Sequence, residues 1–372
     1  MGEIWKFSSY VIIIPFLSQF LPPCNLFLTL NNHNKLLNFT HDVPSMKTKL
    51  FKQIKRFLPI FGIILFFYLI YILDVDKIYT AFLSIPPLYI ILSALISIPV
   101  ILLRNYIWIL VSRQQHIHMG YRSSMKIFLI GYFYGTITPG YIGQLMRIPY
   151  MKEKTREPYG KLFVNTFLET TLHALSLYIM MMIGGILIIS IYPRLVIIIC
   201  IWLLVMTILF IFFLKKERGE PLLSTLIKYM IPKRSKKNVQ QFVNTFYADF
   251  PKARMLLIPL LLGSITWVLM FIQYYLIILA LGISTIPFLM FLVLYPIANT
   301  ASFIPITFAG LGTREFTAII LFTSLFAVSQ TQVFVFTLVG FLITDVLTGF
   351  YGFILLLTEA KQKDFIKTDV TH

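Results

Sequence analysis

Long apolar runs alternate with short polar segments along most of this chain. Six of the runs are long enough to cross a bilayer as helices, which takes about 17–25 residues each. Their approximate bounds are 57–73, 88–111, 162–189, 195–214, 255–281 and 332–357. The pattern therefore predicts an all-α polytopic membrane protein with about six spanning helices.

Two further apolar stretches, 127–146 and 287–328, are interrupted by glycine, proline and threonine. Broken helices at membrane depth are tolerated only where they are buried in protein or line a cavity. Arg147 follows the first break and Arg314 follows the second. Helix N-termini attract anions, so we predict a site for a negatively charged membrane molecule.

Positive charge orients the first half of the chain. The segments 47–56, 112–126 and 147–161 are all basic, and basic loops face the cytoplasm. Both flanks of 127–146 then lie on one side of the membrane. This predicts a re-entrant hairpin that enters from the cytoplasm and turns at 138–140.

The second half runs in the opposite sense. The loop 215–254 and the tail 358–372 are basic, which makes them cytoplasmic. The stretch 287–328 then begins and ends outside, as a second re-entrant hairpin entered from the opposite face. The alternative is two full crossings that place 309–313 at the cytoplasmic surface.

These assignments divide the chain into two membrane repeats, 47–191 and 192–357, of opposite direction. Inverted repeats of this kind are typical of transporters, with the site near the midplane where the repeats meet. Residues 1–46 differ in composition and are predicted to be an extension outside the functional chain. Both termini are predicted to be cytoplasmic and the protein to lie in the plasma membrane.

The formal net charge of +17 raises the question of nucleic acid. The basic residues lie between the apolar runs, where cytoplasmic loops and anionic headgroups require them, so no nucleic-acid partner is expected. Cys24 and Cys200 form neither a CxxC motif nor a Cys/His cluster. No metal site and no cofactor are therefore predicted.

Few charges lie at membrane depth, where each costs about 2.5–3.5 kcal/mol. As site residues, Arg147 and Arg314 would each grip a lipid phosphate through two N–H groups. The alternatives are that Arg147 is an ordinary cytoplasmic flank and that Arg314 pairs with a carboxylate to fix the fold. Asp345, in the middle of its helix, needs a partner, for which Arg314 or Arg104 is available.

Further candidates have two interpretations each. Arg104 either contributes to the site or extends its head group to the membrane surface. Glu169 and His173 share one helix face and either hold a headgroup or form a local polar pair. Glu315 is as compatible with a structural role as with a functional one.

Four glycines lie in the breaks, Gly140, Gly143, Gly310 and Gly312. They permit tight turns and close backbone approach, or they allow helices to pack closely. Their clustering at the breaks favours turns, so we include them among the predicted substrate-binding residues.

The two breaks resemble those of a known membrane family. The resemblance rests on 138–144 with Arg147, on Glu169, and on 310–315, and it covers roughly 47–357. The family includes the transmembrane region of lysylphosphatidylglycerol synthetases and their flippase-like relatives. It implies translocation of an anionic or amino-acid-modified lipid, or of a polyprenyl-linked glycan.

The prediction is thus a flippase-like transporter of a lipid with a phosphate headgroup. The aminoacyl-transfer domain of the synthetases has no counterpart here, so aminoacylation of lipid is not expected. One alternative is a membrane-embedded transferase of polyprenyl-linked glycan assembly, for which Asp74 and Asp76 in the predicted outer loop 74–87 are weak candidates. Another is a non-catalytic partner of glycan-assembly or lipid-modifying enzymes.

Overall fold

The computed structural model describes residues 62–190, 249–303 and 307–369, with a few further residues between 193 and 208 and at 244–246. Within these ranges the chain is helical apart from turns and one isolated bridge. The helices are Gly62–Leu73, α4 (Val75–Leu83), α5 (Pro87–Gln114), α6 (Tyr121–Thr136), η1 (Ile142–Met146), α7 (Arg147–Thr155), α8 (Tyr159–Leu187), η3 (Ala253–Leu256), α12 (Leu257–Ala280), α13 (Phe288–Thr300), η4 (Ala301–Phe303), α14 (Thr313–Phe326), α15 (Gln330–Phe341), η5 (Leu342–Val346) and α16 (Leu347–Asp369). The all-α prediction is confirmed.

Four helical units are long and apolar enough to cross a membrane: α5, α8, α12 with η3 before it, and the run from α15 into α16. Each corresponds to a predicted span. The first predicted span is seen from Gly62 to Leu73. Most of the span predicted at 195–214, the extension 1–46 and most of the loop 215–254 lie outside the described residues.

The prediction of an outer loop at 74–87 is wrong in part, because this segment contains helix α4. Asp74 caps this helix: its carboxylate accepts a hydrogen bond from the Asp76 backbone N–H at 3.2 Å. The same carboxylate lies 3.8 Å from the ammonium of Lys77. These acids therefore serve an exposed helix end.

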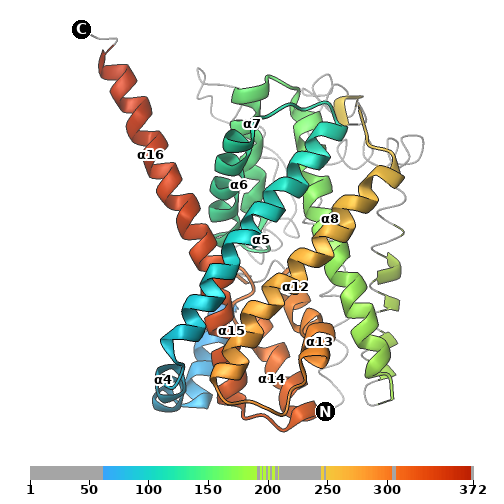
Figure 1. The fold of residues 1–372 in the computed structure, drawn as a ribbon, viewed down its shortest axis with the longest axis vertical. Helices are drawn as coiled ribbons and strands as arrows, with labels where there is room; N and C mark the ends of the chain where they lie inside the picture. The colour runs from blue at the N-terminus through green and yellow to red at the C-terminus, as the bar shows by residue number, and fades with distance from the viewer. Residues whose placement is uncertain are drawn as a thin grey trace, which may run out of the picture.

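The first hairpin is longer than the predicted 127–146. Its inward arm, α6, begins at Tyr121, and its outward arm continues through η1 and α7 to Thr155. The turn between the arms uses left-handed backbone at Gly140 (φ 59°) and Tyr141 (φ 57°). Both ends of the hairpin lie at the same end of the molecule as the end of α5 (Figure 1).

The second hairpin, α13 and α14, enters from the opposite end (Figure 1). Helix α13 has 13 residues, which is about 20 Å of helix against about 30 Å of hydrocarbon. The alternative of two full crossings is therefore wrong. The tips of the hairpins meet inside the molecule, where Pro139 and Phe308 form an antiparallel bridge.

The two halves interlock. Helix α5 packs along α12, α6 packs along α16, and α13 packs along α8. Each hairpin thus packs against the last spanning helix of the other half. Gly352 of α16 allows the approach to α6, since a Cβ there would collide with the Leu129 carbonyl. Gly184 of α8 does the same for α13, against the Val293 carbonyl.

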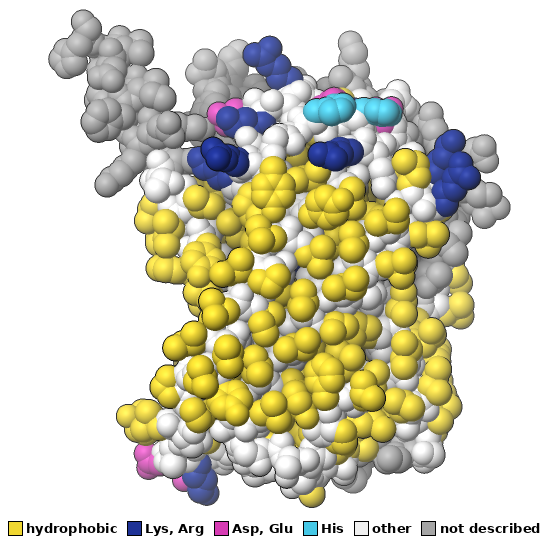
Figure 2. Space-filling view, viewed as in Figure 1, with side chains coloured by type: hydrophobic (Ala, Val, Ile, Leu, Met, Phe, Trp, Pro, Cys, Tyr) yellow, Lys and Arg dark blue, Asp and Glu magenta, His cyan; other side chains and the backbone are white. Residues whose placement is uncertain are grey.

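The surface agrees with a membrane environment. Figure 2 shows hydrophobic side chains over the flank of the molecule, with charged side chains gathered at its two ends. Lysines, arginines and histidines dominate one end, which is the end of the first hairpin. This distribution is the one expected if that end faces the cytoplasm.

Candidate functional site

Six charged side chains are buried where the hairpin tips meet the long helices. They are Arg104, Arg147, Arg314, Glu169, Glu315 and Asp345. One other charged side chain is buried among the described residues, Lys161, and it pairs with Asp249 at 2.9 Å near the basic end. Buried charges are costly unless paired, and the six pair among themselves.

The first cluster is built around Glu169 of α8. Arg147, the first residue of α7, donates to the Glu169 carboxylate at 2.7 Å and to the Gln144 side chain at 3.0 Å. Arg104 of α5 lies 3.6 Å from the other Glu169 oxygen. One carboxylate therefore serves two guanidinium groups.

Aromatic rings surround these guanidinium groups. Both lie over the ring of Phe128, Arg104 at 5.3 Å and Arg147 at 4.6 Å from its centroid. Arg147 also lies over Trp108, at 5.3 Å. Gly131 makes room for Arg147, because a Cβ there would come within 2.7 Å of its Nε. Cation–π contacts stabilise cations that have left water.

The second cluster closes the tip of the other hairpin. Arg314 donates through Nε and Nη2 to one oxygen of Glu315, at 3.1 and 2.7 Å. The other Glu315 oxygen accepts the Gly312 backbone N–H at 2.6 Å. The sequence predicted that an anion binds at the N-terminus of the helix after the second break. In this conformation the Gly312 N–H at that N-terminus is bound by the carboxylate of Glu315 instead.

Asp345 joins the two halves. Its Oδ1 accepts hydrogen bonds from the hydroxyls of Tyr132 at 2.7 Å and Tyr141 at 2.9 Å. Both tyrosines belong to the first hairpin, whereas Asp345 lies in the second repeat. Asp345 also lies in η5, a π-helical turn within an otherwise α-helical run. Such turns recur at functional sites.

Several expectations need correction. Arg147 is not a cytoplasmic flank, since its side chain is fully buried. Arg104 does not extend to the surface, because it is 6% exposed and faces Glu169. The predicted pairing of Asp345 with Arg314 is present at 3.9 Å, but the nearer carboxylate of Arg314 is Glu315, at 2.7 Å.

Two more expectations concern the partners of the buried acids. His173 does not pair with Glu169, because His173 stacks on Trp267 with centroids 4.3 Å apart. The tyrosines that hold Asp345 were not among the predicted site residues. Tyr141 lies inside the first break motif, which was a usable signal, but nothing in the sequence distinguished Tyr132.

The glycines of the breaks serve turns. Gly140, Gly310 and Gly312 have left-handed backbone, with φ of 59°, 83° and 87°. Gly143 serves close approach, because a Cβ there would meet the Tyr134 carbonyl. Turns at three of the glycines and a close backbone approach at Gly143 agree with the predicted local roles.

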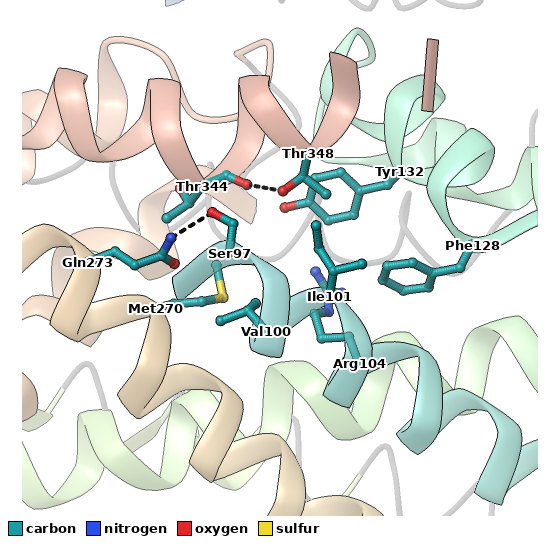
Figure 3. Close-up of a pocket in the computed structure, with 10 residues that line it drawn as sticks. All are labelled: Ser97, Val100, Ile101, Arg104, Phe128, Tyr132, Met270, Gln273, Thr344 and Thr348. Atoms are coloured by element: carbon teal, nitrogen blue, oxygen red, sulfur yellow. Dashed lines mark hydrogen bonds between the residues drawn. The ribbon is translucent and has the colours of Figure 1, made fainter. Parts of the chain in front are cut away.

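A small cavity lies beside Arg104, between α5, α6, α12 and the η5–α16 segment (Figure 3). Its volume is about 10 Å³. Two buried polar atoms of its lining residues have no hydrogen-bond partner, the Nε of Arg104 and the Oε1 of Gln273. The amide nitrogen of Gln273 donates to Ser97 at 2.8 Å.

The apolar spanning helices make this a polytopic helical membrane protein, and its two opposed hairpins meet at a charged junction between those helices. The model of the family described as lysylphosphatidylglycerol synthase TM region matches residues 58–352. The chain belongs to this family, as its two breaks led us to expect. No match was found among proteins of curated function.

Proposed function

We propose that the protein is a flippase-like transporter of a lipid with an anionic phosphate headgroup, either a phospholipid or a polyprenyl-phosphate-linked lipid. The observation that carries the proposal is Arg104. This guanidinium is buried at the hairpin junction, its Nε has no hydrogen-bond partner, and its contact to Glu169 spans 3.6 Å. A hydrogen bond would need about 3.2 Å or less.

An incompletely bonded guanidinium is suited to a phosphate. Its planar fork matches two phosphate oxygens, which an ammonium does not. Arg147 lies on the other side of the same carboxylate. The first cluster holds two arginines and one carboxylate, so it has an excess of positive charge to offer an anion.

The described conformation is closed. A cavity of about 10 Å³ has room for about one water molecule, and a phosphate group is larger. Entry of a headgroup therefore requires the first hairpin to shift relative to α5 and the η5–α16 segment. Inverted-repeat transporters move in this way, one repeat rocking against the other around a central site.

The test is lipid movement by the purified full chain in vesicles. Fluorescent phosphatidylglycerol in the inner leaflet becomes accessible to an external quencher when it is moved. Arg104→Gln removes the cation and Arg104→Lys keeps the charge without the fork. Hydrogen bonds to charged groups contribute about 1.5–3 kcal/mol each, so we expect each variant to slow movement about tenfold or more.

The matched control is Arg113→Gln, which removes an exposed arginine of the same helix and should leave movement unchanged. A second arm uses a fluorescent polyprenyl phosphate, which distinguishes the two lipid classes. If the wild-type protein moves neither lipid, the proposal is refuted and a transferase or a partner role takes its place. If Arg104→Gln moves lipid at the wild-type rate, the assignment of Arg104 is refuted.

A further inference from the structure

The two charged clusters carry opposite net charges. The first holds Arg104, Arg147 and Glu169, and the second holds Arg314, Glu315 and Asp345. The first therefore has one positive charge in excess and the second one negative charge. Together they balance, so the empty site is neutral as a whole.

Neutrality cannot persist when an anion enters. A phosphodiester bound at Arg104 and Arg147 would use the positive excess and leave the second cluster's negative charge uncompensated inside the membrane. Uncompensated charge at this depth is costly. A positive charge must therefore accompany the lipid or the site must stay hydrated.

We propose that Asp345 takes up one proton when an anionic lipid binds, so that lipid and proton cross together. This inference rests on the proposed function and supplies its energy source. The step adds a proton from the aqueous phase to a carboxylate oxygen of Asp345, forms an O–H bond, and breaks no other covalent bond. Release of the same proton on the far side returns the carboxylate.

The partners of the three carboxylates single out Asp345. Glu169 lies between two arginines, and Glu315 is bonded to Arg314 and to a backbone N–H of its own hairpin. Asp345 has its nearest cation at 3.9 Å, and hydroxyl groups hold its oxygens, including Thr344 at 3.0 Å. A hydroxyl rotates and accepts as readily as it donates, so it accommodates a protonated carboxyl.

The groups around Asp345 are mostly hydrogen-bond donors. The described residues contain no group of three or more His, Cys, Asp or Glu side chains that could hold a metal. The titratable groups in contact with Asp345 are Tyr132 and Tyr141 of the first hairpin and Arg314 of α14, and Tyr274 of α12 interacts with it electrostatically. Arg104 of α5 and Glu315 of α14 lie one contact further away, against Tyr132 and Arg314. Five of these six are donors in their ordinary states.

The same proton would act on the first hairpin. Tyr132 and Tyr141 tie that hairpin to Asp345 through hydrogen bonds to a charged oxygen. Such bonds are roughly twice as strong as those between neutral groups. Protonation therefore loosens the hairpin at the moment the lipid arrives, which couples the proton to the motion.

The test measures lipid and proton movement together in vesicles that contain the full-length protein, fluorescent phosphatidylglycerol and an enclosed pH-sensitive dye. A pH difference across the membrane should drive labelled lipid into the leaflet on the alkaline side. For one proton per lipid the leaflet ratio at equilibrium approaches about tenfold per pH unit. A potassium diffusion potential at equal pH should drive no accumulation, because the pair is neutral.

Variants test whether Asp345 is the residue that takes up the proton. Asp345→Asn should abolish both the proton signal and the effect of the pH difference. Tyr132→Phe keeps the carboxylate but removes a donor that stabilises its charged form, so the pH midpoint of transport should rise. Tyr275→Phe is the matched control, since its hydroxyl bonds the Ile286 carbonyl, and its midpoint should equal that of the wild type.

The outcomes separate the two proposals. Wild-type protein that moves lipid equally with and without a pH difference overturns proton coupling and leaves the flippase function standing. Wild-type protein that moves no lipid overturns both. If Asp345→Asn does not fold, an unchanged midpoint in Tyr132→Phe overturns the assignment to Asp345, and a raised midpoint supports it.

Discussion

Glu169 is expected to be the most sensitive member of the first cluster. Its carboxylate is the counter-ion of both Arg104 and Arg147, at 3.6 and 2.7 Å. Glu169→Gln keeps the shape of the side chain and removes its charge. Two buried guanidinium groups would then share no carboxylate, and their mutual repulsion would be unscreened.

The magnitudes follow from what each variant leaves behind. Removing one partner of a buried ion pair costs about 3–5 kcal/mol, because a charge stays buried without compensation. Glu169→Gln should reach the upper part of that range, since it leaves two such charges. Arg147→Met should cost less, because Arg104 can move closer to Glu169. Arg104→Met should cost least, since it leaves the 2.7 Å pair intact.

The assay is reversible unfolding of the purified protein in mixed micelles, followed by helix content. The expected order of destabilisation is Glu169→Gln, then Arg147→Met, then Arg104→Met. Arg113→Gln, on the exposed side of α5, is the control for loss of an arginine outside the cluster. Equal losses for the three cluster variants, or a Glu169→Gln protein as stable as the wild type, would refute the shared-carboxylate argument.

Three further predictions test the hairpins. In intact cells an impermeant maleimide should label a cysteine at Ser329 and not one at Ser123, since these lie at opposite ends of the molecule. Labelling of both would show that the basic end does not face the cytoplasm. Gly312→Ala should impair folding, because φ is 87° and a Cβ would lie 2.7 Å from the Gly62 carbonyl, whereas Gly120→Ala meets nothing within 4 Å and should fold normally. Cysteines replacing Pro139 and Phe308 in a background without native cysteines should form a disulfide on oxidation, since bridged residues lie about 4.5–5.5 Å apart; oxidised protein that still runs as uncrosslinked would show that the tips do not meet.

Hydropathy predicted the spanning helices well because the bilayer imposes one strong constraint. A helix such as α5 or α12 must be apolar along its length, whatever it packs against. The two helix breaks could also be predicted, since glycine and proline clustered at membrane depth favour an interrupted helix. Charge balance gave opposed directions for the two hairpins, and the arrangement in Figure 1 agrees.

The sequence did not predict all the partners of the buried polar groups inside the site. Asp345 has the predicted arginine, Arg314, at 3.9 Å, but its shortest hydrogen bonds come from hydroxyls of residues more than 200 positions away. Arg314 was expected to lie beside free N–H groups, but the carboxylate of the next residue in the chain binds the Gly312 N–H. The Tyr132 and Tyr141 contacts depend on how the hairpins meet the long helices, and no local pattern encodes that. The contact between Glu315 and Gly312 is local, a capping box at the start of α14, and the spacing of these two residues was a usable signal. Helix α4 was missed for a different reason: at nine residues it is too short to give a periodic signal.

The contacts between the first hairpin and the second repeat set the cost of opening the site. Two hydrogen bonds tie the hairpin to Asp345, and bonds to a charged group contribute about 1.5–3 kcal/mol each. Breaking both therefore costs about 3–6 kcal/mol, while the packing of α6 on α16 can be kept if the hairpin slides along it. Inverting a 99:1 population requires about 5.5 kcal/mol. Two fork contacts to a lipid phosphate are bonds of the same kind and similar strength. A bound headgroup can thus offset the opening without being held so tightly that it cannot leave, which is the balance that a transporter requires.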